Sequence, residues 1–371
     1  MFGIIGLLLI ALIAIQTELV QNWLVGIASK RISRDLGTEV KIKHVSFAFF
    51  NRANLEGTLI RDTQKDTLLY AGQLKVRITD WFFTKSNSEL KFIGLEDATI
   101  KLQRKDSVWN YQFIVDYFSS SSPTKEKKAG MQLSLKKIDF KNVSFIQKDL
   151  WAGETLAANF TSLTLDAENI NFAKNIIVLN EVNLDRPYFS ITNYPALKPA
   201  VIKKLLVDTG LSLNPSRMFL QVASLKITNG NFVNTGNDRK PLNYFDADHL
   251  NFSKLDANFT NILLNNDTLK INMDLSCKER SGIDLKRLKA NFKVTPQIME
   301  LANLDLKLNK SKLGNYFAMK FNHFNVDFGE YVTNVLMDAK FSSSKVFSDD
   351  IAFFAPSLKT WKKEFDLTGN F

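Results

Sequence analysis

The sequence has a single cysteine in 371 residues, Cys277. One cysteine excludes an intrachain disulfide, so the compartment is reducing or the fold is stable without covalent cross-links. A free cysteine usually behaves as a small hydrophobic residue, and we therefore expect Cys277 to be buried.

Motifs of known catalytic and metal sites are also missing. There is no HExxH, CxxC or GxSxG pattern and no glycine-rich phosphate loop. The three histidines, His44, His249 and His323, lie far apart in strand-like segments, where a solvated or hydrogen-bonded histidine is commoner than a metal ligand. Acidic residues occur as Asp62 and Asp66, Asp246 and Asp248, and Asp349 and Asp350. Paired acids form a hydrolase site only at a calibrated separation, so the sequence predicts no enzyme, metal or cofactor.

The basic residues are not concentrated on one segment. Forty-eight Lys and Arg against 38 Asp and Glu give a net charge of +10, which favours anionic surfaces such as phospholipid head groups or nucleic acid. In segments such as Lys136, Ile138 and Phe140, however, lysine alternates with apolar residues as in a half-buried sheet. Nucleic-acid binding is not predicted, because it needs basic residues and stacking aromatics gathered on one face.

One long apolar run is present, residues 2–15. As a helix it would be about 21 Å long, against a hydrocarbon core of about 30 Å. The next segment continues the helix with apolar residues at every fourth position: Leu24, Ala28, Ile32 and Leu36. Trp23 suits a membrane interface, and Gly37 is placed to end the helix. We predict a membrane anchor formed by Phe2, Ile4, Ile5, Leu7, Leu8, Leu9, Ile10, Leu12, Ile13 and Ile15.

Two alternatives to an anchor are a cleaved signal peptide and a buried helix. A signal peptide needs a basic n-region and a small-x-small cleavage site, and the sequence has neither. The basic residues Lys30, Arg31 and Arg34 follow the run, which by the positive-inside rule would keep the body in the cytoplasm. We therefore expect further residues before Met1.

From Thr38 onward the helical period gives way to the two-residue alternation of β-strands. The first strand has a predicted bulge between Ile42 and Val45. Alternating apolar residues recur at Val40 and Ile42 with Val45, Phe47 and Phe49; at Leu74, Val76 and Ile78; at Leu163, Leu165 and Ala167 with Ile170 and Phe172; at Leu269, Ile271, Met273 and Leu275; and at Leu304, Leu306 and Leu308.

Four segments are similar to one another: 92–102, 137–147, 182–191 and 224–234. Aligning Ile100, Phe145, Phe189 and Phe232 gives spacings of 45, 44 and 43 residues. A period of this size predicts stacked supersecondary units and not one closed barrel. In each copy a polar pair followed by a small or ring residue interrupts the alternation and is expected to bend the strand: Ala98, Val143, Pro187 and Gly230.

Other segments interrupt the β pattern. Residues 119–130 are expected to form a flexible loop, and residues 196–209 and 348–365 short helices, the second with Ser348 as its N-cap. The sequence ends at LTGNF, within an expected strand, which a longer parent chain would explain.

The order of segments resembles the start of TamB-like proteins of the AsmA superfamily, in the form found in Bacteroidetes. The similarity lies in the anchor followed by LGTEVKIKHVSFAFFNRANLEGTLIRDTQKDTLLYAGQLKVRI (36–78), LKFIGLEDATIKLQR (90–104), VWNYQFIVDYF (108–118) and a polar loop. The segment 348–371 is also similar to a recurrent element of that family, around FFAP (353–356). The motifs are loose hydrophobic patterns, although together they cover most of the chain.

The resemblance implies a mainly β fold: a membrane helix followed by a repeating β-groove, a solenoid-like curved sheet with a few short helices. The expected domains are the anchor and amphipathic helix (1–37), a first β-groove unit (38–118), the loop (119–130) and further repeats (131–371). The resemblance also implies a single-pass protein of the inner membrane with its body in the periplasm. The chain differs from the family pattern in lacking a basic N-terminal flank and the family's C-terminal domain.

Two functions follow from the resemblance. In the first, the protein carries phospholipid between the inner and outer membranes through an apolar groove; in the second, it binds client β-strands during outer-membrane protein assembly, with a BamA-like partner. An enzyme such as a glycan hydrolase has no motif in its favour. The candidate lipid groove consists of Leu74, Val76, Ile78, Leu163, Leu165, Leu269, Ile271 and Met273.

Overall fold

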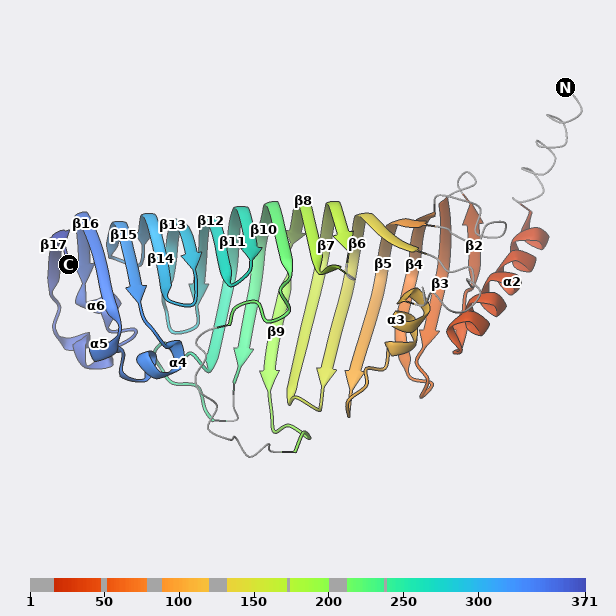
Figure 1. Cartoon of the computed structure of the whole chain (residues 1–371), viewed down its shortest axis with the longest axis horizontal. Coiled ribbons are helices and arrows are strands. Elements are labelled where there is room, and N and C mark those ends of the chain that lie inside the picture. Colours follow the sequence, from red (N-terminus) through yellow and green to blue (C-terminus); the bar gives the residue numbers. More distant parts are fainter. Residues whose placement is uncertain are drawn as a thin grey trace, which may run out of the picture. The chain divides into compact units, whose positions relative to one another are not determined.

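The computed structural model describes residues 17–47, 52–78, 89–119, 132–171, 174–199, 212–236 and 239–371. The fold is mainly β, with 62% strand and 13% helix and a large curved sheet, which confirms the mainly β part of the predicted fold class (Figure 1). The chain divides into two compact units: unit 1 comprises residues 1–164 with 195–198, and unit 2 comprises residues 165–194 with 199–371.

The described part of unit 1 contains a first helix, a ladder of strands and a second, short helix. Its elements are α2 (Glu18–Leu36), β1 (Val40–Lys41), β2 (His44–Phe47), β3 (Arg52–Arg61), β4 (Thr67–Ile78), β5 (Glu89–Arg104), α3 (Gln112–Ser119), β6 (Gln132–Asp149) and the first part of β7 (Glu154–Asn171). Strand β3 pairs antiparallel with β1, β2 and β4, and β4 pairs antiparallel with β5. Strands β5 and β6 are parallel neighbours.

Helix α2 ends where the sequence predicts. Gly37 adopts a left-handed conformation with φ of 67°, and its N–H donates to the carbonyl of Ser33. Ile32 and Leu36 pack against the first strands, while Trp23 is exposed. The predicted anchor at residues 2–15 lies outside the described residues, and within the described residues no helix has the length and apolar character needed to cross a bilayer.

The predicted bulge after Ile42 is confirmed as an interruption between β1 and β2. Both strands pair with β3, and the chain between them passes close to Gly57. A side chain at Gly57, where φ is 60°, would bring its Cβ 2.5 Å from Cδ of Lys43. Glycine therefore allows both the positive φ and the close approach.

Unit 2 contains two parallel strand pairs and an antiparallel meander. Its strands, after the second part of β7, are β8 (Ile176–Asp185), β9 (Tyr188–Asn193), β10 (Phe219–Thr235), β11 (His249–Asn265), β12 (Thr268–Glu279), β13 (Asp284–Val294), β14 (Ile298–Lys307), β15 (Lys312–Lys320), β16 (Leu336–Phe347) and β17 (Glu364–Asn370). Strand β10 is parallel to β8 and β9. From β10 to β17 each strand pairs antiparallel with the next.

The four similar segments occupy equivalent positions in parallel strand pairs. Ile100 lies opposite Phe145 in the pair β5–β6, and Phe189 lies opposite Phe232 in the pair β9–β10. The residue before each predicted interruption has a positive φ: Asp97 at 51°, Asn142 at 53°, Arg186 at 45° and Asn229 at 50°. Asn142 Nδ2 also donates to Asp97 Oδ1 at 2.6 Å. The sequence repeat therefore corresponds to a recurring left-handed residue, within β5, β6 and β10 and, at Arg186, between β8 and β9.

Residues 348–365 do not form the predicted single helix. They form α6 (Ser348–Ile351), a 3-10 turn η3 (Pro356–Thr360) and the start of β17, because Pro356 restricts Ala355 to a non-helical conformation. Ser348 is the first helical residue and Phe347 the N-cap; the Ser348 hydroxyl instead accepts from the N–H of Lys363.

The remaining predicted insertions are mostly undescribed. Of the predicted loop, only Ser119 is described, and it ends α3; of the predicted helix at 196–209, residues 196–199 have no regular structure and the rest lie outside the described residues. Two helical parts of the structure have no counterpart among the predicted elements: α3, and the insertion of α4 (Phe324–Asp327), η2 (Phe328–Glu330) and α5 (Tyr331–Asn334).

Candidate functional site

The predicted groove residues of unit 1 lie on one face of its sheet. Directly opposed residues of neighbouring strands share a face, so the strand register defines rows of side chains across the sheet. One row consists of Val45, Leu55, Leu74, Leu95 and Phe140, and a second of Ala53, Val76, Ile93 and Ile138. We call these rows, without Val45, which lies under helix α2, and with the neighbouring Ala71, Ala98 and Val143, the apolar face of unit 1.

This face is partly buried by contacts within the sheet. Ala71, Leu95, Ala98 and Val143 form a buried cluster, and Leu74 packs against it while remaining half-buried. Val76 is half-buried as well, and Ile78 lies opposite Leu90 although its side chain is outside what the structure describes. Lys75 lies between Leu74 and Val76 on β4, so its side chain belongs to the opposite face, and it forms an ion pair with Glu96 at 2.9 Å.

Unit 2 carries a longer apolar face. One row runs through the direct register partners Ile177, Leu220, Leu264, Leu269, Val294, Met299, Met319 and Met337, from β8 to β16. At about 4.8 Å between strands, its eight members span roughly 34 Å. A second row contains Val182, Leu225, Phe259, Met273 and Ala290. We call these rows, with Ile271 and Phe292 between them, the apolar face of unit 2.

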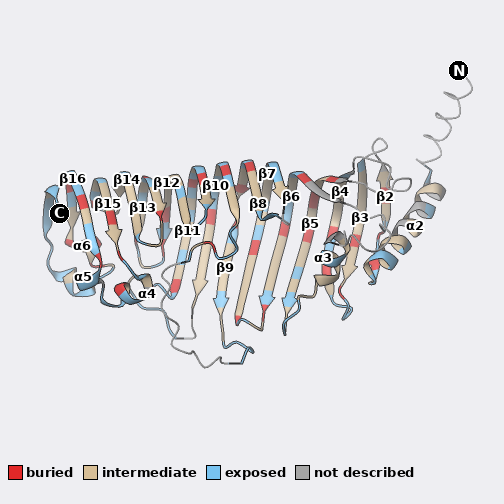
Figure 2. Ribbon diagram, viewed as in Figure 1, coloured by how far each residue is buried: buried red, intermediate tan, exposed pale blue. Residues whose placement is uncertain are grey.

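The centre of the unit 2 face is a cluster whose described members all belong to strands. Ala167, Leu179, Val222 and Ile262 are buried, and the partly buried residues around them include Leu165, Leu269 and Ile271. Every member of the cluster belongs to β7, β8, β10, β11 or β12. Figure 2 shows isolated buried positions along strands that are otherwise of intermediate burial or exposed. Curvature brings these side chains together without a helix in the cluster.

The structure therefore divides the predicted groove residues into two sets. Leu165, Leu269 and Ile271 meet in the unit 2 cluster, and Met273 lies beside them on the same face. Leu74 and Val76 belong to the face of unit 1. Leu163 is half-buried on β7 and falls in unit 1, because the division between the units lies after Thr164. A single trough formed by all eight residues stays a prediction.

Of the unit 2 face, only Leu269, Ile271 and Met273 were among the predicted groove residues. The rows also contain, on β8 to β11, Ile177, Val182, Leu220, Leu225, Phe259 and Leu264. On β13 to β16 they continue through Ala290, Phe292, Val294, Met299, Met319 and Met337, beside Leu301 and Phe317. Their two-residue alternation was visible, for example in Phe292 with Val294 and in Phe317 with Met319. The pairing of distant strands, which places them in one row, was not visible.

The opposite face of unit 2 carries charges that are paired across strands. Arg287 contacts Asp274 at 2.8 Å and Asp305 at 3.4 Å, and the hydrogen bond from Arg287 holds the pKa of Asp274 below its usual value. Lys320 contacts Asp338 at 2.9 Å. Exposed ion pairs contribute at most about 1 kcal/mol each. Their main effect is to keep this face hydrated while the other face is apolar.

A second polar cluster fixes the loop between β10 and β11. Arg239 donates to Asp246, at 2.6 Å to Oδ1 and 2.8 Å to Oδ2, and His249 Nδ1 lies 3.1 Å from Asp246 Oδ2. These hydrogen bonds, with the N–H groups of Leu242 and Asp248, hold the pKa of Asp246 far below its usual value, the contact with Arg239 being the strongest cause. His249 is thus a buried, hydrogen-bonded histidine, as the sequence predicts for this residue type.

Metal and thiol chemistry find no support in this arrangement. Among the described residues there is no group of three histidine, cysteine or acidic side chains placed to hold a metal ion. Cys277 is buried, as predicted, and burial raises the pKa of its thiol to about 11, with smaller contributions from Glu279 and Asp284. A thiol with this pKa is almost entirely protonated at neutral pH, which makes it a weak nucleophile.

Comparisons with known protein families and curated proteins add no evidence for a function. The chain is matched by no protein-family model and by no curated protein.

Proposed function

We propose that this protein is a membrane-anchored carrier of phospholipid in the cell envelope, with its body in the periplasm and the acyl chains held on its apolar faces. The observation that supports this proposal is the row of apolar side chains running from β8 to β16 at right angles to the strands. A carrier needs a continuous apolar path, and a row of this length is unusual on a face whose central cluster, as far as the structure describes it, contains strand residues only.

The physical driving force is ordinary apolar burial. Each buried CH₂ group contributes about 0.8 kcal/mol, so an acyl chain gains enough free energy from a smooth aliphatic surface without any specific contact. The row contains leucine, isoleucine, valine and methionine and no polar residue. Such a surface binds many acyl chains with similar affinity, which favours movement along the row over tight binding at one position.

The charges on the opposite face support the same proposal. Because Arg287, Asp274 and Asp305 form ion pairs with one another, that face favours water over lipid. Acyl chains would therefore occupy one face only, with the head groups remaining in water.

Site-specific photo-crosslinking in cells tests this function. A photoreactive amino acid would replace Ile271 or Val76 on the apolar faces, with the adjacent Lys270 or Lys75 replaced as the matched control on the opposite face. We expect phospholipid adducts at Ile271 and Val76 and none at the lysines. Adducts at the lysines alone would mean that the faces are reversed.

The same experiment separates the alternative function. If the apolar positions give protein adducts with no phospholipid, the face binds client β-strands, as expected for an assembly factor that works with a BamA-like partner. A folded protein with no adduct at any position would contradict both functions.

A further inference from the structure

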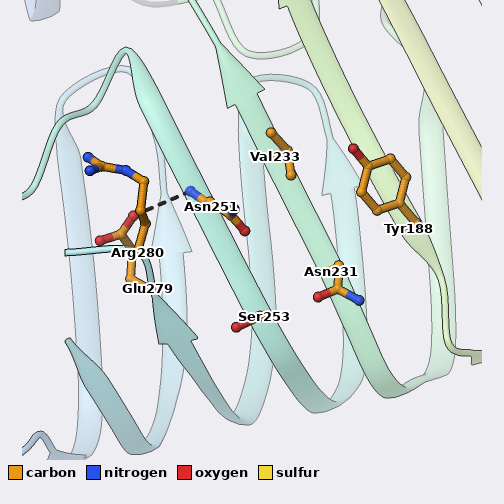
Figure 3. Close-up of a pocket in the computed structure, with 7 residues that line it drawn as sticks. All are labelled: Tyr188, Asn231, Val233, Asn251, Ser253, Glu279 and Arg280. Carbon is orange, nitrogen blue, oxygen red and sulfur yellow. Dashed lines mark hydrogen bonds between the residues drawn. The ribbon is translucent and has the colours of Figure 1, made fainter. Parts of the chain in front are cut away.

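A polar hollow lies on unit 2, on the face opposite the aromatic side chains of β9 to β11. It has a volume of about 570 Å³. Phe189, Phe232 and Phe252 are direct register partners on one face; the residues that alternate with them on β9, β10 and β11, together with Glu279 and Arg280 at the end of β12, line the hollow. The lining consists of Tyr188, Asn231, Val233, Asn251, Ser253, Glu279 and Arg280 (Figure 3).

The uncharged polar side chains of the hollow have unused hydrogen-bonding capacity. Within the described part of the chain, the side-chain amides of Asn231 and Asn251 and the hydroxyl of Tyr188 form no hydrogen bond. Each asparagine amide offers two donor hydrogens and an acceptor oxygen, and the tyrosine hydroxyl can donate or accept. Figure 3 shows these three side chains extending from neighbouring strands around one space.

The charged side chains at the margin are held by the protein itself. Arg280 donates to the carbonyls of His249, Leu242 and Tyr244, at 3.2, 2.8 and 3.4 Å. Glu279 accepts from the N–H of Asn251 at 3.3 Å and from the N–H of Ser281 at 2.6 Å. These contacts fix one wall of the hollow and leave its centre uncharged.

The neutral groups of the hollow differ from the charged groups elsewhere on the same sheet surface. On β12 to β14, Arg287 pairs across strands with Asp274 and Asp305. At the hollow, the side chains of Asn231 and Asn251 are neutral and form no hydrogen bond within the described residues, and they lie beside the ring of Tyr188, which is 38% exposed. A ring beside amide groups combines an apolar surface with several directional hydrogen-bonding groups.

We propose that this hollow binds a neutral sugar ring of a glycan. The apolar C–H face of a sugar would stack on Tyr188, while its hydroxyl groups would exchange hydrogen bonds with Asn231 and Asn251. The volume lies within the range of about 300–1,000 Å³ that is usual for small-ligand sites. A phosphorylated ligand fits less well, because the one arginine here already donates to three carbonyls.

Saturation-transfer NMR on the full-length protein, in a detergent without a sugar head group, tests this site with chitotriose and maltotriose as probes. We expect transfer to at least one of the two oligosaccharides, and at least about tenfold weaker binding in both Tyr188→Ala and Asn251→Ala. Tyr188→Phe keeps the ring and should lose only about threefold.

The matched control is Asn258→Ala, since Asn258 is an exposed asparagine on the same strand, β11, but outside the hollow. Circular dichroism establishes that each variant is folded. The proposal is overturned if the folded wild-type protein binds neither oligosaccharide, or if Asn258→Ala weakens binding as much as Asn251→Ala. The outcome is independent of the phospholipid crosslinks, which probe the other face.

Discussion

Two apolar clusters of this protein are built in different ways. At the start of unit 1, Val40, Ile42 and Val45 are buried beneath Val25, Ile32 and Leu36 of helix α2. In unit 2, the described members of the cluster around Leu179 and Val222 all belong to strands. The first cluster is a two-layer core, whereas the second has a buried centre surrounded by half-buried strand residues such as Leu269 and Ile271.

The difference lies at the margins of the clusters, because the centre of each is buried. Val45, beneath the helix, is 1% exposed, whereas Leu269 and Ile271 remain of intermediate burial on a face that is equally apolar. A helix-covered core excludes any ligand because its side chains are close-packed. A strand-only face leaves apolar surface that an acyl chain can cover.

The largest effect is expected for Val45→Asp. A carboxylate under α2 would have no partner and no access to water, so the variant should lose about 4 kcal/mol of stability or fail to fold. Urea denaturation of the full-length protein in mild detergent, followed by circular dichroism, measures the change. The control is Glu39→Asp, a conservative change at a half-exposed carboxylate that already pairs with Lys41. A loss below about 1 kcal/mol in Val45→Asp would mean that α2 does not exclude water.

Leu269→Asp sharpens the comparison, because the same charge enters the strand-only face. The new carboxylate can reach water, so we expect a loss of about 1–2 kcal/mol and a protein that stays folded. Phospholipid crosslinking at Ile271 should fall in this variant. If Leu269→Asp is as destabilising as Val45→Asp, the unit 2 face is a closed core and the proposed function is wrong.

Asn229→Val tests whether the left-handed residue within β10 supports the curvature. Asn229 has a φ of 50°, and a β-branched residue in that region costs about 1–2 kcal/mol. Asn229→Gly should be close to neutral by the same measurement, since glycine adopts a positive φ freely. Equal stability of the two variants would show that the strand bends for another reason.

The pH dependence of stability tests the role of Asp246, which lies in unit 2 outside the apolar face. The pKa of Asp246 in the folded protein lies far below its ordinary 3.8, so Asp246 stabilises the fold above about pH 4, and this contribution is lost as the pH falls through the folded pKa. Asp246→Asn should be less stable at pH 7 and should lose less stability between pH 4 and pH 2. Asp248→Asn, at an exposed carboxylate near the same arginine, is the control and should change little. If the stability of Asp246→Asn depended on pH as that of the wild-type protein does, Asp246 would not be the group responsible.

The last prediction concerns the rate at which the Cys277 thiol is labelled, and it involves no change in stability. With a pKa of about 11, Cys277 should react with a disulfide reagent at pH 8 on the order of 100-fold more slowly than a free thiol. Full labelling is expected in denaturant. Rapid labelling of the folded protein would show that the strand-only face opens often. A Val45→Cys, Cys277→Ala variant gives the corresponding rate under α2.

Local features were predicted well because they depend on a few neighbouring residues. The alternation at Leu269, Ile271 and Met273 predicted a strand, and Gly37 predicted the end of α2. The 44-residue step between Phe145 and Phe189 pointed to equivalent positions, and both residues occupy them in parallel pairs. The helix predicted at 348–365 was wrong, because the restriction that Pro356 places on Ala355 outweighed the apolar period.

The sequence by itself determined which residues alternate, where the strands bend and that the chain is mainly β. It also limited the chemistry, since it holds one cysteine and no catalytic motif. Only the tertiary structure decided which strands pair, and therefore that Leu220, Leu269 and Met319 belong to one row. It likewise decided which face a helix covers and that Tyr188, Asn231 and Asn251 surround one hollow. The physical reason is that alternation assigns a side chain to a face of its own strand, whereas the register between strands distant in sequence follows from packing of the whole sheet.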